Sequence, residues 1–461
     1  MLNSSMQQSP RKTKSSFAHF IFSCILILTF FTSATFFAQQ NDSIQLPFAI
    51  AKEKKLSDED LANKKEGLYL TGAPDLSSDP VNGFGYGGEG SIYFNGKKSD
   101  PFFAYTPYRA RLDLVLFNTT RQQREIFLKL DVPYIFDTKW RLRLEGGYEA
   151  NPNHLYFGNT EQSLNGLSYY PNNDSSATAI NNAEYQQYES SLVGNNRFYN
   201  NYSKKEAVLN VSLERSYLDG KLRCLIGYEV AYVDFSPFSG NSLLRKDADA
   251  GKIVGLKKGI VELMQVGLIY DTRDLETDPS NGVFAELTNE TSLQALGSLY
   301  DFNKTFTHFN LYKKILPNTF KKLVIAARLA FGYTALNSPF FEYQDEWSSE
   351  GSIEGLGGAT TLRGFKQSRF LSRAMSFNNL ELRYRFAQTT LLKQHLAFSA
   401  VPFADAGAVW DNLQRVVQQN NFKYDAGLGL RIAWNVNTIL RFDYAVSKED
   451  KQFFFNLAHA F

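Results

Sequence analysis

The chain ends in residues 452–461, which read QFFFNLAHAF. One parity of this stretch is apolar or aromatic, namely Phe453, Phe455, Leu457, His459 and Phe461, and the other carries Gln452, Asn456, Ala458 and Ala460. A strand with one large apolar face and one small or polar face fits a wall between lipid and a wet lumen. Taken alone, it also fits a strand with one face on a soluble core and one in water.

The rest of the chain repeats this period of two. Between 109 and 116, for example, Leu112, Leu114 and Leu116 alternate with Arg111 and Asp113. Segments with this alternation lie at 84–94, 109–116, 123–134, 140–148, 209–214, 222–232, 259–271, 282–292, 302–313, 325–333, 380–386, 396–410, 427–434, 440–446 and 452–461. These are about fifteen strands of roughly ten residues, the length that a tilted strand needs to cross a bilayer. Because single-chain bacterial barrels usually close with an even number, we expect sixteen, the missing one lying between 153 and 200.

Charged residues on the polar parity separate the two interpretations. Arginines such as Arg141, Arg328 and Arg441 would need a solvated outer sheet in a soluble sandwich. In a barrel they share one hydrated interior with the carboxylates of other strands. The pattern therefore predicts an all-β fold, a 16-stranded antiparallel transmembrane β-barrel.

The N-terminal region predicts export. Arg11, Lys12 and Lys14 precede an apolar run from Phe17 to Phe37, so we expect a signal peptide over residues 1–38. A retained transmembrane helix is the alternative, since about 20 apolar residues can span a bilayer. Residues 39–82 are expected to form a short periplasmic segment, with a capped helix or a solvated tether after Ser57, and residues 83–461 the barrel. The localisation that follows is the outer membrane of a Gram-negative bacterium.

Several functional classes have little support. The net charge of +2 gives no reason to expect nucleic acid as a partner. The histidines after residue 38 are His154, His308, His395 and His459, and none has a serine and a carboxylate in a recognisable constellation. No Cys/His ligand cluster or lysine-bearing phosphate loop appears either. We therefore expect no enzyme activity, no catalytic residue, no metal ion and no cofactor.

Three motifs go beyond a generic barrel. The first is D-x-R-D, then P-x-x-G, formed by Asp271, Arg273, Asp274, Pro279 and Gly282. Taken alone, it is typical of a tight turn with solvated charges. The second is Arg363, Gly364 and Phe365 inside the long connection 337–376. It indicates a folded-back loop whose guanidinium needs a carboxylate, and taken alone it also fits a mobile surface loop. The third is F-x-D-x-G at Phe403, Asp405 and Gly407, whose apolar opposite parity directs Asp405 into the lumen.

In this order, together with N-x-E-L-R at 379–383, G-L-G-L-R at 427–431 and a terminal Phe461, the motifs resemble the BamA/TamA family, also called the bacterial surface antigen family. The resemblance implies a long external loop folded into the lumen, with Arg363 held by Asp405. The lumen charges Glu381, Arg383, Arg431 and Asp443 would surround that pair. It also implies a weakly paired seam between the first and last strands of the barrel, here the strand near Phe84–Phe94 and the strand that ends at Phe461. Phe461 itself would be the terminal aromatic residue that marks the C-terminal strand of the family.

One departure from the family affects function. The typical member carries periplasmic POTRA modules before its barrel, and residues 39–82 are too few for one. We therefore expect a short member that assists insertion or translocation of outer-membrane or secreted proteins with separate periplasmic accessory proteins, in contact with outer-membrane lipid. The alternative is a passive channel or structural barrel.

Overall fold

The computed structural model describes residues 45–79, 82–174, 176–192, 194–237, 240–416 and 422–461. Residues Gln45–Phe461 form one compact unit. The predicted signal peptide lies outside the described residues.

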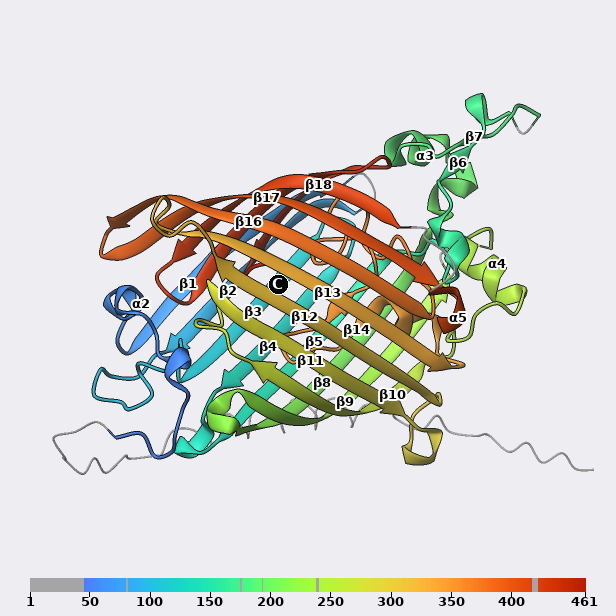
Figure 1. Ribbon diagram of the computed structural model, residues 1–461. Coiled ribbons are helices and arrows are strands. Elements are labelled where there is room, and N and C mark those ends of the chain that lie inside the picture. Colours follow the sequence, from blue (N-terminus) through green and yellow to red (C-terminus); the bar gives the residue numbers. More distant parts are fainter. Residues whose placement is uncertain (1–44, 80–81, 175, 193, 238–239, 417–421) are drawn as a thin grey trace, which may run out of the picture. The chain divides into compact units, whose positions relative to one another are not determined.

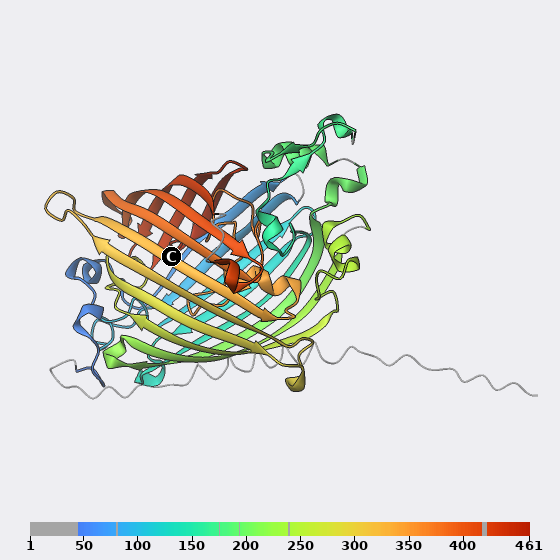
Figure 2. The ribbon, with the colours of Figure 1, turned by 45° about the vertical axis from the view of Figure 1, so that its right-hand side comes forward.

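Sixteen strands form a single antiparallel sheet that curves into a nearly closed barrel (Figures 1 and 2). Strands of this sheet that follow one another in the chain are neighbours in the sheet, so the sheet has no crossover, and β1 and β20 are its two edges. The strands are β1 (Leu68–Asp79), β2 (Gly83–Phe94), β3 (Ala110–Thr119), β4 (Arg124–Val132), β5 (Trp140–Leu155), β8 (Asn201–Tyr217), β9 (Leu222–Pro237), β10 (Gly259–Asp271), β11 (Asn281–Ser292), β12 (Phe302–Lys314), β13 (Leu323–Leu336), β16 (Ala374–Leu391), β17 (Gln394–Trp410), β18 (Lys423–Trp434), β19 (Thr438–Val446) and β20 (Lys451–Leu457). The predicted fold class is confirmed.

The wall is apolar outside and polar inside. On β10, Val266 and Leu268 are about half exposed, 52% and 47%, whereas the alternate residues Gln265 and Ile269 are buried. Other exposed apolar side chains of the outer face are Leu116, Ile226, Leu329, Leu380, Leu428 and Phe453. This arrangement is the reverse of a soluble protein and suits a lipid environment. The soluble sandwich does not fit it.

The start of the barrel differs from the prediction. β1 begins at Leu68, within the segment assigned to the periplasm, so the sheet starts before Gly83. β1 is also the missing sixteenth strand. The sixteenth strand was expected between 153 and 200. The described residues between 156 and 200 contain only two strands, β6 (Ser168–Tyr169) and β7 (Ile180–Asn181), each of two residues. Pro74 on β1 hides the strand from sequence reading, yet an edge strand can hold a proline.

The connections differ at the two ends of the barrel. At one end, here called the turn end, they are mostly short: β2–β3, β4–β5, β8–β9, β10–β11, β12–β13, β16–β17 and β18–β19. At the other, the loop end, lie the long connections β5–β8, β9–β10 and β13–β16. The small elements are α2 (Asp58–Asn63), α3 (Tyr185–Ser191), α4 (Leu243–Asp249), α5 (Leu413–Val416), the 3-10 turns η2 (Lys52–Lys54), η3 (Ile135–Asp137), η4 (Glu161–Leu164), η5 (Pro171–Asn173), η6 (Gly194–Phe198), η7 (Leu218–Gly220), η8 (Gln294–Leu296) and η9 (Phe340–Gln344), and the pair β14 (Asp345–Glu346) and β15 (Ile353–Glu354).

Residues before β1 contain the capped helix that was one of two alternatives for this segment. The hydroxyl of Ser57 accepts a hydrogen bond from the backbone N–H of Asp60 at 3.1 Å, which caps α2. No helix in the described ranges is long and apolar enough to cross a membrane.

Candidate functional site in the barrel lumen

The long connection between β13 and β16, residues 337–373, folds back into the barrel, and we call it loop 6. Leu356, Leu362, Phe365 and Phe370 of this loop are all buried and pack in one cluster with Phe377 on the inner face of β16. Apolar burial therefore holds the loop inside the lumen before any charge is considered.

Arg363 lies at the centre of loop 6 and is completely buried. Its Nε and Nη2 donate to the two carboxylate oxygens of Asp405 on β17, each at 2.8 Å. Asn379 donates to the same carboxylate at 2.8 Å, and the guanidinium lies 3.4 Å from the ring centre of Phe403. This is the two-pronged geometry that arginine forms with a carboxylate. Burial opposes the charge, but Asp405 and the neighbouring carboxylates raise the pKa of Arg363 well above its ordinary value.

The surrounding charges predicted from the sequence meet at the same place. Arg363 Nη1 donates to Glu381 at 2.7 Å and to Asp443 at 3.2 Å. Arg431 bridges the same two carboxylates, at 3.2 Å to Glu381 and 2.6 Å to Asp443. Arg383 donates its Nε to Glu381 at 2.8 Å. The structure thus joins loop 6 to β16, β17, β18 and β19 in one buried network, in which each charge has partners.

Gly364 follows Arg363 where loop 6 touches the wall. A Cβ on this residue would lie 2.5 Å from the Cβ of Asp425 and 3.0 Å from that of Ser447. Only glycine fits so close an approach, which gives the middle residue of the R-G-F motif a steric reason.

A second buried arginine of loop 6 was not singled out from the sequence. Arg369 donates to both oxygens of Glu449, at 2.6 and 3.1 Å, in the β19–β20 connection. It also donates to the carbonyl oxygens of Ser163 and Asn165 in the β5–β8 connection, at 2.7 and 3.1 Å. Arg369 therefore ties loop 6 to two other connections at the loop end. Its only sequence signal is its position six residues after Arg363.

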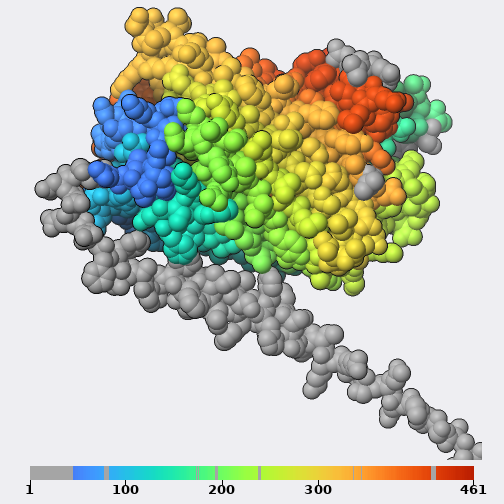
Figure 3. Space-filling model, turned by 60° about the horizontal axis from the view of Figure 1, so that its bottom comes forward, coloured from blue at the N-terminus to red at the C-terminus, as the bar shows by residue number. Residues whose placement is uncertain are grey.

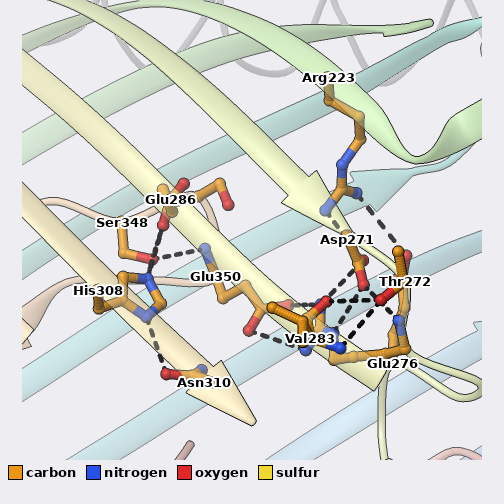
Figure 4. Close-up of polar contacts among 12 residues, drawn as sticks. Arg223, Asp271, Thr272, Glu276, Val283, Glu286, His308, Asn310, Ser348 and Glu350 are labelled. Atoms are coloured by element: carbon orange, nitrogen blue, oxygen red, sulfur yellow. Dashed lines mark hydrogen bonds and ion pairs between the residues drawn. The ribbon is translucent and has the colours of Figure 1, made fainter. Parts of the chain in front are cut away.

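The D-x-R-D motif begins at the last residue of β10, and its Asp271 and Arg273 are buried, not solvated as in a simple turn (Asp271 in Figure 4). Arg273 donates to both oxygens of Asp271, at 3.1 and 3.2 Å, and reaches Glu350 of loop 6 at 3.2 Å. Arg223 of β9 contacts Asp271 at 3.3 Å. The turn is therefore a junction between the wall and the inward loop.

The other motif residues shape this turn. Asp274 accepts backbone hydrogen bonds from Leu275 and Ser280, at 3.0 and 2.9 Å, and Pro279 is buried. Gly282 has a φ of +116°, and a Cβ there would lie 2.4 Å from the carbonyl oxygen of Thr272. A side chain at this position would meet both strain and a clash.

Around His308 the structure contains a group that sequence reasoning missed (Figure 4). Ser348 of loop 6 donates to Glu286 at 2.6 Å, and His308 Nε2 lies 3.0 Å from the same carboxylate and 3.5 Å from the Ser348 hydroxyl. His308 therefore has a serine and a carboxylate nearby in space, which the sequence did not indicate. A catalytic triad needs the base between the serine and the acid, through its two different nitrogens. Here one nitrogen faces both groups and Nδ1 faces Asn310 at 3.2 Å, so the contact fastens loop 6 to β11 and β12.

The C-terminus turns inward, which corrects the predicted terminal strand. β20 ends at Leu457, and Phe461 packs with Tyr312, Val324 and Ala326 on the inner face of β12 and β13. Arg383 donates to a terminal oxygen of Phe461 at 2.8 Å. In both views of the ribbon, the C-terminus lies within the outline of the barrel (Figures 1 and 2). Phe461 therefore does not face lipid.

His459, placed by the alternation on the lipid side, is also redirected. Its Nε2 lies 3.2 Å from Asp278 of the β10–β11 connection. Arg328 of β13 donates to the carbonyl oxygen of Ala460 at 3.2 Å. The last four residues thus leave the wall because they find polar partners inside.

β1 and β20 are the two edges of the sheet, and no ladder between them occurs in the described part of the chain. The predicted first strand of the seam, near Phe84–Phe94, is β2, so the seam lies one strand earlier than expected. At the turn end the seam is bridged by side chains instead: Thr71 of β1 and Thr438 of β19 have their hydroxyl oxygens 2.8 Å apart. β1 is paired with β2 on one side, and the short β20 leaves its other edge without a backbone partner here.

No group of three or more potential metal ligands occurs among the residues with described positions. The expectation of no metal ion rests on the sequence and stays a prediction.

Comparisons with known proteins agree with this architecture. The family model described as the Omp85 superfamily domain matches residues 115–461, more than half of the chain. A second model, described as a domain of unknown function (DUF5982), matches residues 46–109. A search of curated protein sequences gives no match.

Two solved structures are similar to the chain at low sequence identity. CdiB from Escherichia coli is 9% identical, with a TM-score of 0.50, over 85% of this chain and 62% of that one. BamA from Haemophilus ducreyi lacking POTRA domains 1–3 is 16% identical, with a TM-score of 0.49, over 86% of this chain and 70% of that one. At 9% identity, the CdiB structure supports the barrel fold alone.

Proposed function

The chain belongs to the Omp85 superfamily, and from that premise we propose that it is an outer-membrane barrel that assists insertion or translocation of outer-membrane or secreted proteins. It acts without covalent chemistry, by offering an unpaired strand edge to a client.

The observation that carries this proposal is the seam. β1 spans Leu68–Asp79, whereas β20 has only the seven residues Lys451–Leu457, and the chain then turns into the lumen. An unpaired edge presents a row of backbone donors and acceptors, which is a template for another strand. Natural sheets protect such edges, so an edge left open in a lipid-facing wall supports a role in strand exchange.

Loop 6 supports the same function from inside. The network around Arg363 fixes the loop against β16 to β19, next to the last strand. A fixed loop occupies the lumen, so a client would leave sideways through the seam instead of through an open pore. We assign to Arg363, Gly364, Phe365 and Asp405 the role of a loop-to-lumen lock.

The apolar outer face supports an outer-membrane location. In bacterial outer-membrane barrels, short connections face the periplasm and long ones the exterior. On this rule we assign the turn end, with residues 45–66, to the periplasm. Separate periplasmic proteins would deliver clients there, and outer-membrane lipid surrounds the wall.

Site-specific photo-crosslinking in living cells tests the proposal. A photoreactive residue replaces Leu70 on the outer face of β1, 62% exposed, and in a control replaces Leu268 on the outer face of β10, 47% exposed. We expect crosslinks to newly made outer-membrane or secreted proteins from position 70 and not from position 268. Equal yields at both positions would contradict a role for the seam. A large, steady conductance unchanged by Arg363→Ala would instead favour a passive channel.

A further inference from the structure

Residues 45–66, which we call the strap, cross the mouth of the barrel at the turn end. Contacts connect the strap with every connection at this end: Leu56 with Ala104 of β2–β3, Phe48 with Tyr134 of β4–β5, Ala51 with Asp219 of β8–β9, Leu56 with Leu275 of β10–β11, Glu59 with Lys321 of β12–β13, Lys65 with Lys393 of β16–β17 and Leu56 with Val436 of β18–β19. In the space-filling view, the blue N-terminal part of the chain lies against green segments from the middle of the sequence (Figure 3). A segment that contacts every turn around a rim covers the opening that the rim encloses.

Specific groups dock the strap. Leu56 is 4% exposed and packs with Leu61, Leu275 and Val436. Its backbone N–H donates to the carbonyl oxygen of Ala104 at 2.8 Å. Lys64 is buried and donates to the carbonyl oxygens of Phe103 and Thr106 at 2.6 and 2.7 Å. These contacts order a segment whose regular structure is limited to the 3-10 turn η2 and the short helix α2.

One contact of the strap reaches into the lumen. Lys54 forms an ion pair with Asp271 at 3.0 Å, and the Asp271 side chain is fully buried. Asp271 is also bound by Arg273, which in turn pairs with Glu350 of loop 6. A continuous line of ion pairs thus runs from the strap through the D-x-R-D motif to the loop that enters from the opposite end.

We propose that the strap is a displaceable lid over the turn end of the lumen, and that the line Lys54–Asp271–Arg273–Glu350 couples lid displacement to release of loop 6. When Lys54 leaves, Asp271 loses one of three cations and keeps Arg223 and Arg273. Arg273 is then drawn toward Asp271 and away from Glu350. Coupling of this kind is reciprocal, so loss of Glu350 loosens the strap. The lid concerns the barrel's own conformational states and does not depend on the proposed function.

Hydrogen exchange of the full-length protein in lipid nanodiscs tests the lid. Lys54→Glu places a carboxylate against Asp271, whereas Lys55→Glu makes the same change of charge at an exposed neighbouring position. With Lys54→Glu we expect exchange about tenfold faster or more, both in residues 45–66 and around Glu350, because exchange reports local opening. Lys55→Glu should leave both regions at the wild-type rate.

The outcomes separate the two parts of the proposal. Faster exchange in the strap with an unchanged loop 6 would refute the coupling, and an unchanged strap would refute the anchor. If Lys54→Glu does not fold, Glu350→Gln replaces it, since that variant leaves the strap sequence intact. Reciprocity then requires faster exchange in residues 45–66, and a wild-type rate there would overturn the coupling.

Discussion

Replacing Arg363 by alanine should release loop 6 from the wall while the barrel stays folded. The guanidinium is fully buried and forms ion pairs with Asp405, Glu381 and Asp443. Glu381 and Asp443 keep Arg431 as a partner after the change. Asp405 keeps the amide of Asn379, a long contact from the backbone of residue 363 and the neighbouring carboxyl group of Asp425, none of which is a cation. Asp405 is therefore the group that the substitution leaves as a poorly compensated buried charge.

The size of the effect on loop docking follows from this uncompensated charge on Asp405. Removing one partner of a buried ion pair costs about 3–5 kcal/mol, because the other charge stays buried without compensation. Since about 1.4 kcal/mol is a factor of ten, the docking equilibrium of loop 6 should shift by roughly two to four orders of magnitude. Arg363→Lys keeps the charge but loses the two-pronged geometry, so its shift should be smaller.

Hydrogen exchange of residues 355–372 measures this shift directly, and heat-modifiable electrophoretic mobility shows that the barrel is intact. Arg373→Ala is the matched control, because it removes the same side chain from an exposed position of the same loop. Wild-type protection of loop 6 in Arg363→Ala would refute the reasoning, as would a loss of barrel mobility in every Arg363 variant.

Three further predictions concern the same loop. Burial first, and then nearby carboxylates, raise the pKa of Glu354 from 4.5 to about 7, so its contribution to docking of β15 is full below pH 4.5 and lost as pH rises through about 7. The protection factor of this segment, which is the exchange rate relative to that of an unfolded chain at the same pH, should therefore be higher at pH 5 than at pH 8, and Glu354→Gln should remove that difference. Gly364→Ala should cost about 1–3 kcal/mol of loop docking because its Cβ would overlap Asp425, and a wild-type unfolding midpoint and loop protection would show that the wall can yield. Arg369→Ala leaves Glu449 without its buried cation and should make the loop end susceptible to limited proteolysis; a wild-type cleavage pattern would show that this second contact is dispensable.

The alternation of side chains predicts the wall because lipid and lumen impose opposite chemistry on successive residues. It fails at both ends of the sheet. β1 contains Pro74 and several small polar residues, and as an edge strand it tolerates a proline that a central strand would exclude. At the other end the alternation continues to Phe461, but Asp278 and Arg383 supply partners inside the lumen. Periodicity carries no information about such distant partners.

In the candidate site, too, some contacts can be predicted from the sequence and others cannot. Arg363 and Asp405 could be paired before the structure was known because each lies in a motif whose family role is recognisable. Arg369 lies in no such motif, and its partners come from two other connections. The cluster of Glu286, His308 and Ser348 likewise joins two strands and a loop that are far apart in the sequence. Only folding reveals these contacts.

The most direct test of the central claim is a covalent bond across the seam. The hydroxyl oxygens of Thr71 and Thr438 lie 2.8 Å apart, so a Thr71→Cys/Thr438→Cys pair in a Cys224→Ser background places two thiols within bonding reach. A second pair, Asn289→Cys/Thr305→Cys, joins β11 and β12, which are already paired.

Quantitative proteomics of outer membranes, in cells that depend on each variant, measures the outcome under oxidising and reducing conditions. The account predicts that oxidation of the seam pair lowers client abundance, that reduction restores it, and that the β11–β12 pair has no effect. Wild-type client levels with the seam fully oxidised would contradict the account.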